Sequence, residues 1–273
     1  MVSEVEYTGE RMDPQYADCA TFCEHIHRYS FAAQWVKNQR VLDIASGEGY
    51  GSYGLQRAGA RSVIGVEIDP ATCARARQKY GIDVRVGSAE AIPLESNSVD
   101  VVVSFETIEH VSHPEIFVNE VSRVLVRNGT FIVSTPETKL YSPDGKEPNP
   151  YHCSEMTRDQ FENLLASRFD SVRLFGQRPQ FARWWSAVSL LAEFSPWDRV
   201  TPIAALRPRI WANGDSRRLR QVPQFARQNP ADSILSARKS WAERLLNWSS
   251  VRPVRRTNSW SPVFLVAVAR KTR

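Results

Sequence analysis

A glycine-spaced loop directly after an apolar, acid-containing run constrains this chain more than any other feature. Residues 40–51 read RVLDIASGEGYG, so a buried strand would end in a tight turn that leads into a helix. Glycines in such a turn lack the Cβ atoms that would keep a ligand away from the backbone. A second apolar run, residues 63–69, ends in Glu67 and Asp69. An acid at the tip of the neighbouring strand can accept hydrogen bonds from a ribose, so the pair predicts a nucleotide-type cofactor site.

Short β-type runs recur along the first two thirds of the chain, with helical segments between several of them. Most are consecutive rather than alternating apolar, which is typical of strands covered on both faces of a parallel sheet. The runs cover residues 41–45, 63–68, 84–86, 99–104, 131–134, 172–175 and, near the end, 263–268. We therefore predict an α/β fold with a doubly wound, Rossmann-like, seven-stranded and mostly parallel sheet, whose ligands bind at the carboxyl ends of the strands.

Local signals place the ends of several helices. Pro70 and Pro114 can each open a helix, and Asn128-Gly129 is the predicted stop of the second one. Residues 157–160 read TRDQ, which is typical of a capping box. Asp69 competes with Glu67 for the cofactor role, and we interpret Asp69 as the cap of the helix at Pro70.

The long gap before the last β-type run predicts an insertion. Its composition differs from the rest: after residue 176 the chain carries 18 Lys/Arg against 5 Asp/Glu, whereas the preceding residues carry 17 against 25. Seven of the eight tryptophans also follow residue 176. The predicted organisation is an N-terminal lid or acceptor segment, a core, a basic Trp-rich insertion and a final core strand, at residues 1–39, 40–176, 177–260 and 261–273.

The sequence contains no apolar run of about 18 residues, which a membrane-spanning helix would need. Its first residues, MVSEVE, are acidic and lack the order of a signal peptide. The four cysteines form no CxxC pair, which favours buried thiols in a reducing compartment. We expect a cytoplasmic protein, or one peripheral to the inner face of the cell membrane.

The cofactor can be narrowed from the acids around the loop. Residues 49–54, GYGSYG, match the dinucleotide fingerprint GxGxxG literally, but that match alone is weak. Asp43 stands inside the preceding strand and Glu48 inside the loop. These acids would repel a pyrophosphate and suit a ligand with a positively charged ammonium group. The pattern therefore favours an amino-acid-bearing nucleoside over a dinucleotide.

Four linked motifs over residues 40–136 resemble one family. VLDIASGEGYGS, GVEID, GSAEAIPLESNSVDVVVSFETIEHV and RVLVRNGTFIVSTPE are similar to class I S-adenosylmethionine (SAM)-dependent methyltransferases. The resemblance implies SAM as the cofactor, with its methionine part held by a loop that contains Asp43, Ala45, Gly47 and Gly49. It implies that Glu67 holds the ribose hydroxyls and that Ile68 lies against the adenine.

The same resemblance assigns roles further along the chain. Ala89 and Glu90 match the segment at the adenine edge, although Ser88 stands where this family commonly has Asp. Ser104 and Phe105 match the end of the fourth strand, beneath the sulfonium. Two alternatives stay open, because Phe105 fits a plain core position and Glu90 a solvated loop charge.

Two histidines are the candidate catalytic residues. His152 follows the fifth predicted strand, at the rim of the sheet where a general base would stand. His110 belongs to a Glu-His pair, and the histidine of this pair often lines the mouth of the active site in this family. A structural role for His110 stays open. Residues 134–137 read STPE where base-methylating enzymes carry NPPY-type motifs, which argues against nucleic acid as a partner. We predict no metal site, although residues 24–27, EHIH, resemble one superficially.

The flanks suggest an acceptor. Residues 9–11, 24–29 and 149–152 resemble a bacterial methyltransferase subgroup associated with polysaccharide and glycan assembly, which implies O-methylation of a sugar or glycan. The resemblance implies that the N-terminal segment brings Arg11, His27 or Tyr29 to the site. The alternatives are a small metabolite of quinone or polyketide type, an RNA-binding methyltransferase, and a binding module without catalysis.

The basic insertion has three open interpretations. Its tryptophans and arginines would suit an acceptor lid, peripheral contact with an anionic membrane through residues such as 183–191, or RNA binding.

Overall fold

The computed structural model describes residues 12–14, 17, 19–138, 150–177, 252–253 and 263–272. Most of the predicted insertion, and Arg11 of the predicted lid, therefore lie outside the described residues. The sheet has eight strands in the order β3-β2-β1-β4-β5-β8-β6-β7. The strands are β1 (Arg40–Ile44), β2 (Ser62–Glu67), β3 (Asp83–Val86), β4 (Val99–Phe105), β5 (Leu125–Pro136), β6 (Ser171–Gln177), β7 (Arg252–Pro253) and β8 (Phe264–Arg270).

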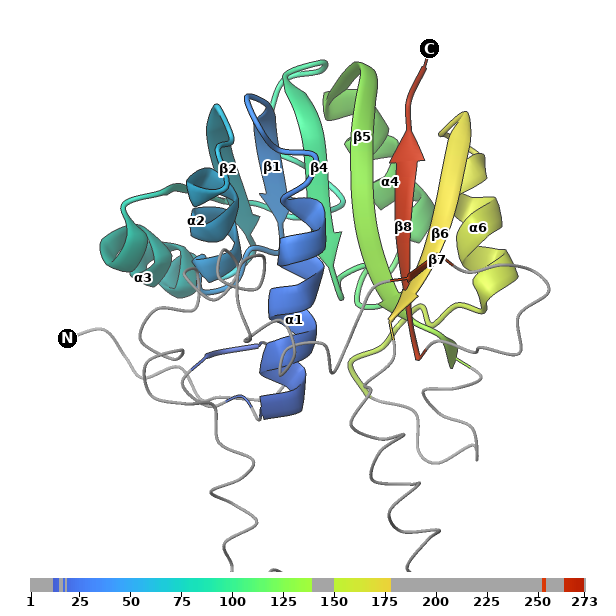
Figure 1. Cartoon of the computed structure of the whole chain (residues 1–273), viewed down its shortest axis with the longest axis horizontal. Helices are drawn as coiled ribbons and strands as arrows, with labels where there is room; N and C mark the ends of the chain where they lie inside the picture. Colours follow the sequence, from blue (N-terminus) through green and yellow to red (C-terminus); the bar gives the residue numbers. More distant parts are fainter. Residues whose placement is uncertain are drawn as a thin grey trace, which may run out of the picture.

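The seven predicted strands are all present, and the predicted fold class is confirmed. β1 to β5 run parallel to one another, while β8 is antiparallel to both β5 and β6, as its opposite arrow in Figure 1 shows. The addition is β7, two residues that pair with the free edge of β6. No run of apolar residues marks so short a strand, so the sequence offered no signal for it.

Helices cover both faces of the sheet (Figure 1). The described helices are α1 (Cys19–Ala32), α2 (Tyr50–Arg57), α3 (Pro70–Tyr80), α4 (Pro114–Val124) and α6 (Arg158–Ala166). Successive residues of β4 serve opposite layers: Val102 joins the core formed with α4 and α6, whereas Val101 and Val103 join the core formed with α1. A fully buried valine contributes about 1.5–3 kcal/mol, which explains why these strands are apolar on both faces.

Two of the predicted caps are present. Asp69 accepts hydrogen bonds from the backbone N–H groups of Ala71 (3.1 Å) and Thr72 (3.2 Å) at the start of α3. Thr157 and Gln160 form the reciprocal capping box of α6. Both caps satisfy backbone donors that have no partner inside the helix.

The predicted end of α4 is wrong. The helix ends at Val124, and Asn128 lies within β5 with a φ of 64°. The carbonyl oxygens of Ser122 and Leu125 instead accept hydrogen bonds from the Lys271 ammonium, at 2.7 and 2.8 Å. A cation at the carboxyl end of a helix offsets its partial negative charge. This partner comes from the end of the chain, so local signals could not reveal it.

Candidate active site

The loop after β1 adopts the backbone that its sequence predicts. Gly47 and Gly49 have φ angles of 53° and 79°, in the left-handed region that favours glycine. A Cβ at Gly49 would lie 2.8 Å from the Ala76 Cβ, so this glycine also lets α3 approach. Ala45 shares the positive φ, at 54°, although it is not glycine. Such strain is common at ligand sites and is held by the surrounding structure.

Glu67 ties the end of β2 to this loop. Its Oε2 accepts a hydrogen bond from the Gly47 N–H at 3.0 Å, and its Oε1 accepts one from the Ile68 N–H at 3.0 Å. The carboxyl group is thereby held at the carboxyl ends of two adjacent strands. Ile68, the next residue, leaves 71% of its surface exposed, which is unusual for an isoleucine. A carboxyl group can accept hydrogen bonds from the hydroxyls of a sugar, and an exposed apolar side chain next to it can pack against a flat ring.

Asp43 is fully buried within β1. Its Oδ2 accepts a hydrogen bond from the Ser52 hydroxyl at 2.6 Å, and the Tyr29 hydroxyl donates to the same carboxyl group at 3.2 Å. Burial is the main cause that raises the pKa of Asp43 to about 7, and the bonds from Ser52 and Tyr29 oppose it. Tyr29 comes from α1, so the N-terminal segment does reach the loop, where the Gly51 backbone leaves room for its ring.

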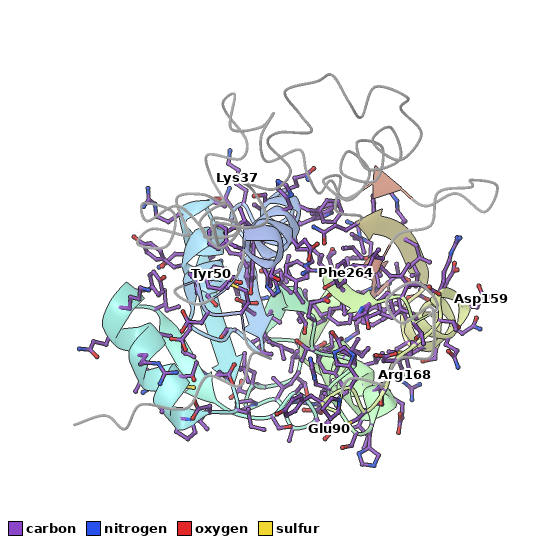
Figure 2. The ribbon with its side chains drawn as sticks, turned by 90° about the horizontal axis from the view of Figure 1, so that it is seen from below. Lys37, Tyr50, Glu90, Asp159, Arg168 and Phe264 are labelled. Atoms are coloured by element: carbon purple, nitrogen blue, oxygen red, sulfur yellow. The ribbon has the colours of Figure 1, made fainter. Side chains whose placement is uncertain are left out.

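A cavity of about 370 Å³ opens where β1, β2 and β4 end. This volume lies within the range of small-molecule sites. Of the predicted site residues, the cavity lining contains Ala45, Glu67, Ile68, Ala89, Glu90 and His110. Figure 2 looks at the molecule from below, toward this end of the sheet, and labels Glu90. The lining does not include the other predicted site residues, which are Asp43, Gly47, Gly49, Ser104, Phe105 and His152.

Three other predicted site residues, Phe105, Ser104 and Glu90, differ in their surroundings. Phe105 is buried in the core shared with α1, where its ring meets the Tyr29 ring edge-on at 5.0 Å, as the core interpretation expects. Ser104 is also buried in the sheet. Glu90 accepts a hydrogen bond from the His113 N–H at 2.6 Å, so it is anchored rather than a solvated loop charge.

The structure brings His110 and His152 together. Their ring centroids lie 4.9 Å apart at an interplanar angle of 79°. His110 Nδ1 lies 3.0 Å from the Tyr151 carbonyl oxygen, and His152 Nδ1 lies 2.8 Å from Glu155 Oε1. Both acceptors require a proton on Nδ1, so the lone pair of each neutral ring is on Nε2. Sequence reasoning missed Glu155, although its spacing of three residues from His152 was visible.

A buried ion pair includes one residue of the cavity lining, Glu106. The Arg28 guanidinium, from α1, lies 3.2 Å from Glu106 Oε1, and the Ser134 hydroxyl donates to the same oxygen at 2.5 Å. Glu106 follows β4 with a φ of 50°. Arg28 was also missed, because no motif marks it. Burial and the nearby Arg28 charge lower the pKa of His27 to about 4, which keeps that imidazole neutral.

Glu109 lies next to this pair and is almost fully buried, with 1% exposure. Neither carboxyl oxygen has a partner at ordinary hydrogen-bond geometry among the described residues. Burial, and then the charge of Glu106, raise the pKa of Glu109 well above its usual value, while the Arg28 charge and the Thr135 hydroxyl oppose that rise. A buried carboxyl group with so little compensation is costly, which points to a functional role.

The stretch of chain that lines the cavity is similar to known proteins. Residues 42–133 match a family model described as "Methyltransferase domain". A protein of Mycolicibacterium smegmatis named "probable S-adenosylmethionine-dependent methyltransferase" is 40% identical over 166 residues, which are 60% of this chain and 64% of that protein. A ubiquinone biosynthesis O-methyltransferase of Bartonella tribocorum is 30% identical over 41% of this chain and 47% of its own length.

Among solved structures, a SAM-dependent methyltransferase from Thermotoga maritima superimposes with a TM-score of 0.56 over 92% of both chains, at 15% identity. That likeness shows the fold, which is the fold of class I methyltransferases. The chain spans less than two thirds of the length of the curated relatives described above. Among the helices that the structure describes, none is long and apolar enough to cross a membrane.

Proposed function

We propose that this protein is a SAM-dependent O-methyltransferase that acts on a hydroxyl of a small acceptor. One observation carries the proposal. A single cavity combines an anchored acid and an exposed apolar side chain, Glu67 and Ile68, with the imidazole of His110. The first two suit a nucleoside, and the imidazole lies beside His152, where a reacting hydroxyl could be activated.

The chain's residues fit the implied cofactor. The cavity volume, the glycine loop that leaves the backbone accessible, and the fixed Glu67 carboxyl group match a nucleoside, while the buried acid Asp43 suits an ammonium group. Glu67 would hold the ribose hydroxyls, and Ile68, Ala89 and Glu90 would border the adenine. When bound, SAM supplies an electrophilic methyl group on a sulfonium.

The remaining residues act on the acceptor. Methyl transfer needs alignment of the acceptor oxygen and removal of its proton. His152 is the proposed proton acceptor, because the bond from Nδ1 to Glu155 orients the ring and keeps the lone pair on Nε2. His110 borders the same point and would position the acceptor oxygen. Both are proposed as catalytic residues.

The acceptor class is a finer proposal. We keep a sugar or glycan hydroxyl as the first candidate, on the resemblance of residues 9–11, 24–29 and 149–152 to glycan-assembly enzymes. A phenolic hydroxyl of quinone type is the second, supported by the similarity to the Bartonella ubiquinone biosynthesis O-methyltransferase. We also propose that residues 177–260 contact a membrane surface or the acceptor. Those residues lie almost entirely outside the described ones.

An acceptor screen tests this proposal. Methyl-labelled SAM is incubated with the protein and with separate pools of sugar and phenolic acceptors, and label transferred to a hydroxyl of either class supports the proposal. Transfer only to amines or to nucleic acid would contradict it.

Glu67 and Asp69 provide a matched pair for the cofactor side. Glu67→Gln is expected to weaken binding of S-adenosylhomocysteine by about 10- to 100-fold, because hydrogen bonds to a charged group are worth about 1.5–3 kcal/mol. Asp69→Asn removes an equal charge two residues away but keeps a helix-capping oxygen, so the affinity should change less than threefold. Isothermal titration calorimetry measures both. Equal losses in the two variants would show that the ribose site is misassigned.

A further inference from the structure

We propose that Glu109, His110 and His152 form a binding site for a divalent transition-metal ion. One ligand atom from each of the three residues lies within 4.8 Å of the other two. Ligands of a bound divalent ion stand about 3 Å apart when adjacent, given metal–ligand distances of about 2.1 Å. Binding of an ion would therefore require the three ligand atoms to move closer together. The sequence offered no reason to expect this site, because His152 is remote in the chain from Glu109 and His110.

The buried carboxyl group of Glu109 is the independent observation that points to a ligand. Arg28, the nearby cation, pairs with Glu106 instead, at 3.2 Å. Neither oxygen of Glu109 has a partner at ordinary hydrogen-bond geometry in the part of the chain that the structure describes, and the Thr135 hydroxyl and the Arg28 charge stabilise its charged form less than burial destabilises it. Buried carboxylates are normally paired or coordinate a metal, so a bound cation supplies the partner that this one lacks.

The contacts of the two imidazoles match those of metal ligands. A metal-bound histidine usually donates its other ring N–H to a carboxylate or a backbone carbonyl, which orients the ring. His152 bonds Glu155 in the first way, and His110 bonds the Tyr151 carbonyl in the second. Two nitrogens and one oxygen favour zinc, iron, cobalt or manganese over magnesium and calcium, which prefer oxygen ligands.

A catalytic role for the ion rests on the proposed function, in which a hydroxyl of the acceptor is methylated. Three protein ligands leave coordination positions for the acceptor oxygen. The ion would lower the pKa of a bound hydroxyl, so that its proton passes to water. His152 cannot hold a proton and a metal on the same nitrogen. It therefore accepts the proton in the metal-free enzyme and coordinates the ion in the loaded one.

Calorimetric titration of the full chain with Zn²⁺ or Co²⁺ alone tests the site, with no SAM or acceptor present. We expect one ion per chain, and a loss of at least tenfold in affinity in each of Glu109→Gln, His110→Ala and His152→Ala. His113→Ala is the matched control: this exposed histidine lies outside the cluster, so its loss should leave ion affinity unchanged. Bound Co²⁺ also gives a visible absorption band that reports nitrogen and oxygen ligands.

Two controls keep the outcomes separate. Glu109→Gln replaces a buried ionisable group with a neutral one of similar shape, so its thermal unfolding midpoint without metal should equal or exceed that of the unchanged protein, which shows that the variant folds. Each variant should still bind S-adenosylhomocysteine, and failure there would challenge the proposed function rather than the metal site. Absence of ion binding in the unchanged protein, or equal binding by Glu109→Gln, overturns the metal proposal.

Discussion

Replacing His152 with alanine is expected to lower kcat by about 100- to 10,000-fold, the usual contribution of a positioned acid or base. The affinity for S-adenosylhomocysteine should stay within threefold, because His152 is not part of the cavity lining around Glu67 and Ile68. Single-turnover methyl transfer and calorimetry measure the two effects. The assay contains a chelator, so that only direct proton transfer is available.

Glu155 and His110 provide the comparisons. Glu155→Gln keeps an oxygen that can accept from His152 Nδ1 but removes the charge, so kcat should fall far less than in His152→Ala, by about tenfold. If His152→Ala retains its rate while His110→Ala abolishes turnover, the proton acceptor is His110 and the assignment is wrong.

Replacing Asp43 with asparagine is expected to stabilise the protein at pH 8 while weakening cofactor binding. Burial raises the pKa of Asp43 to about 7, above its value in an unfolded chain. The folded state therefore binds this proton more tightly than the unfolded chain does. The resulting contribution to the free energy of unfolding is complete below about pH 4 and is lost as the pH rises through about 7. A pKa difference of about three units corresponds to about 4 kcal/mol. Asparagine does not ionise and avoids this loss.

Urea unfolding of both proteins at pH 5 and pH 8 measures this effect. The advantage of Asp43→Asn should be small at pH 5, grow up to about pH 7 and stay constant above it. Ser52→Ala is the control, because it removes the 2.6 Å hydrogen bond to the carboxyl group and should lower stability at pH 8. Equal destabilisation by Asp43→Asn at both pH values would show that its hydrogen bonds from Tyr29 and Ser52 outweigh its burial.

The fold could be predicted because its signals are local and repeated. Consecutive buried valines, such as Val101 to Val103, mark strands that are covered on both faces, and the glycines and acids of residues 43–67 mark the carboxyl ends of two of them. The proposed cofactor residues belong to the same local pattern. Ala45 and Glu67, for example, lie in the lining of the cavity.

The acceptor half of the site depends on contacts between distant segments. Arg28 reaches Glu106 from α1, and His152 reaches His110 across the end of the sheet. Neither contact leaves a spacing pattern in the chain, because each partner is fixed by the packing of its own element. The end of α4 was misplaced for the same reason, since Lys271 holds it from the last strand.

Calorimetric titration with S-adenosylhomocysteine measures whether the cavity binds the nucleoside proposed for it. We expect one binding site per chain, loss of binding in Gly47→Arg, whose side chain would project from the loop at a φ of 53°, and no binding of NAD by either protein. Circular dichroism would confirm that the variant is folded. Binding of NAD by the unchanged protein, with no binding of S-adenosylhomocysteine, would contradict the assignment of the cavity to a sulfonium nucleoside.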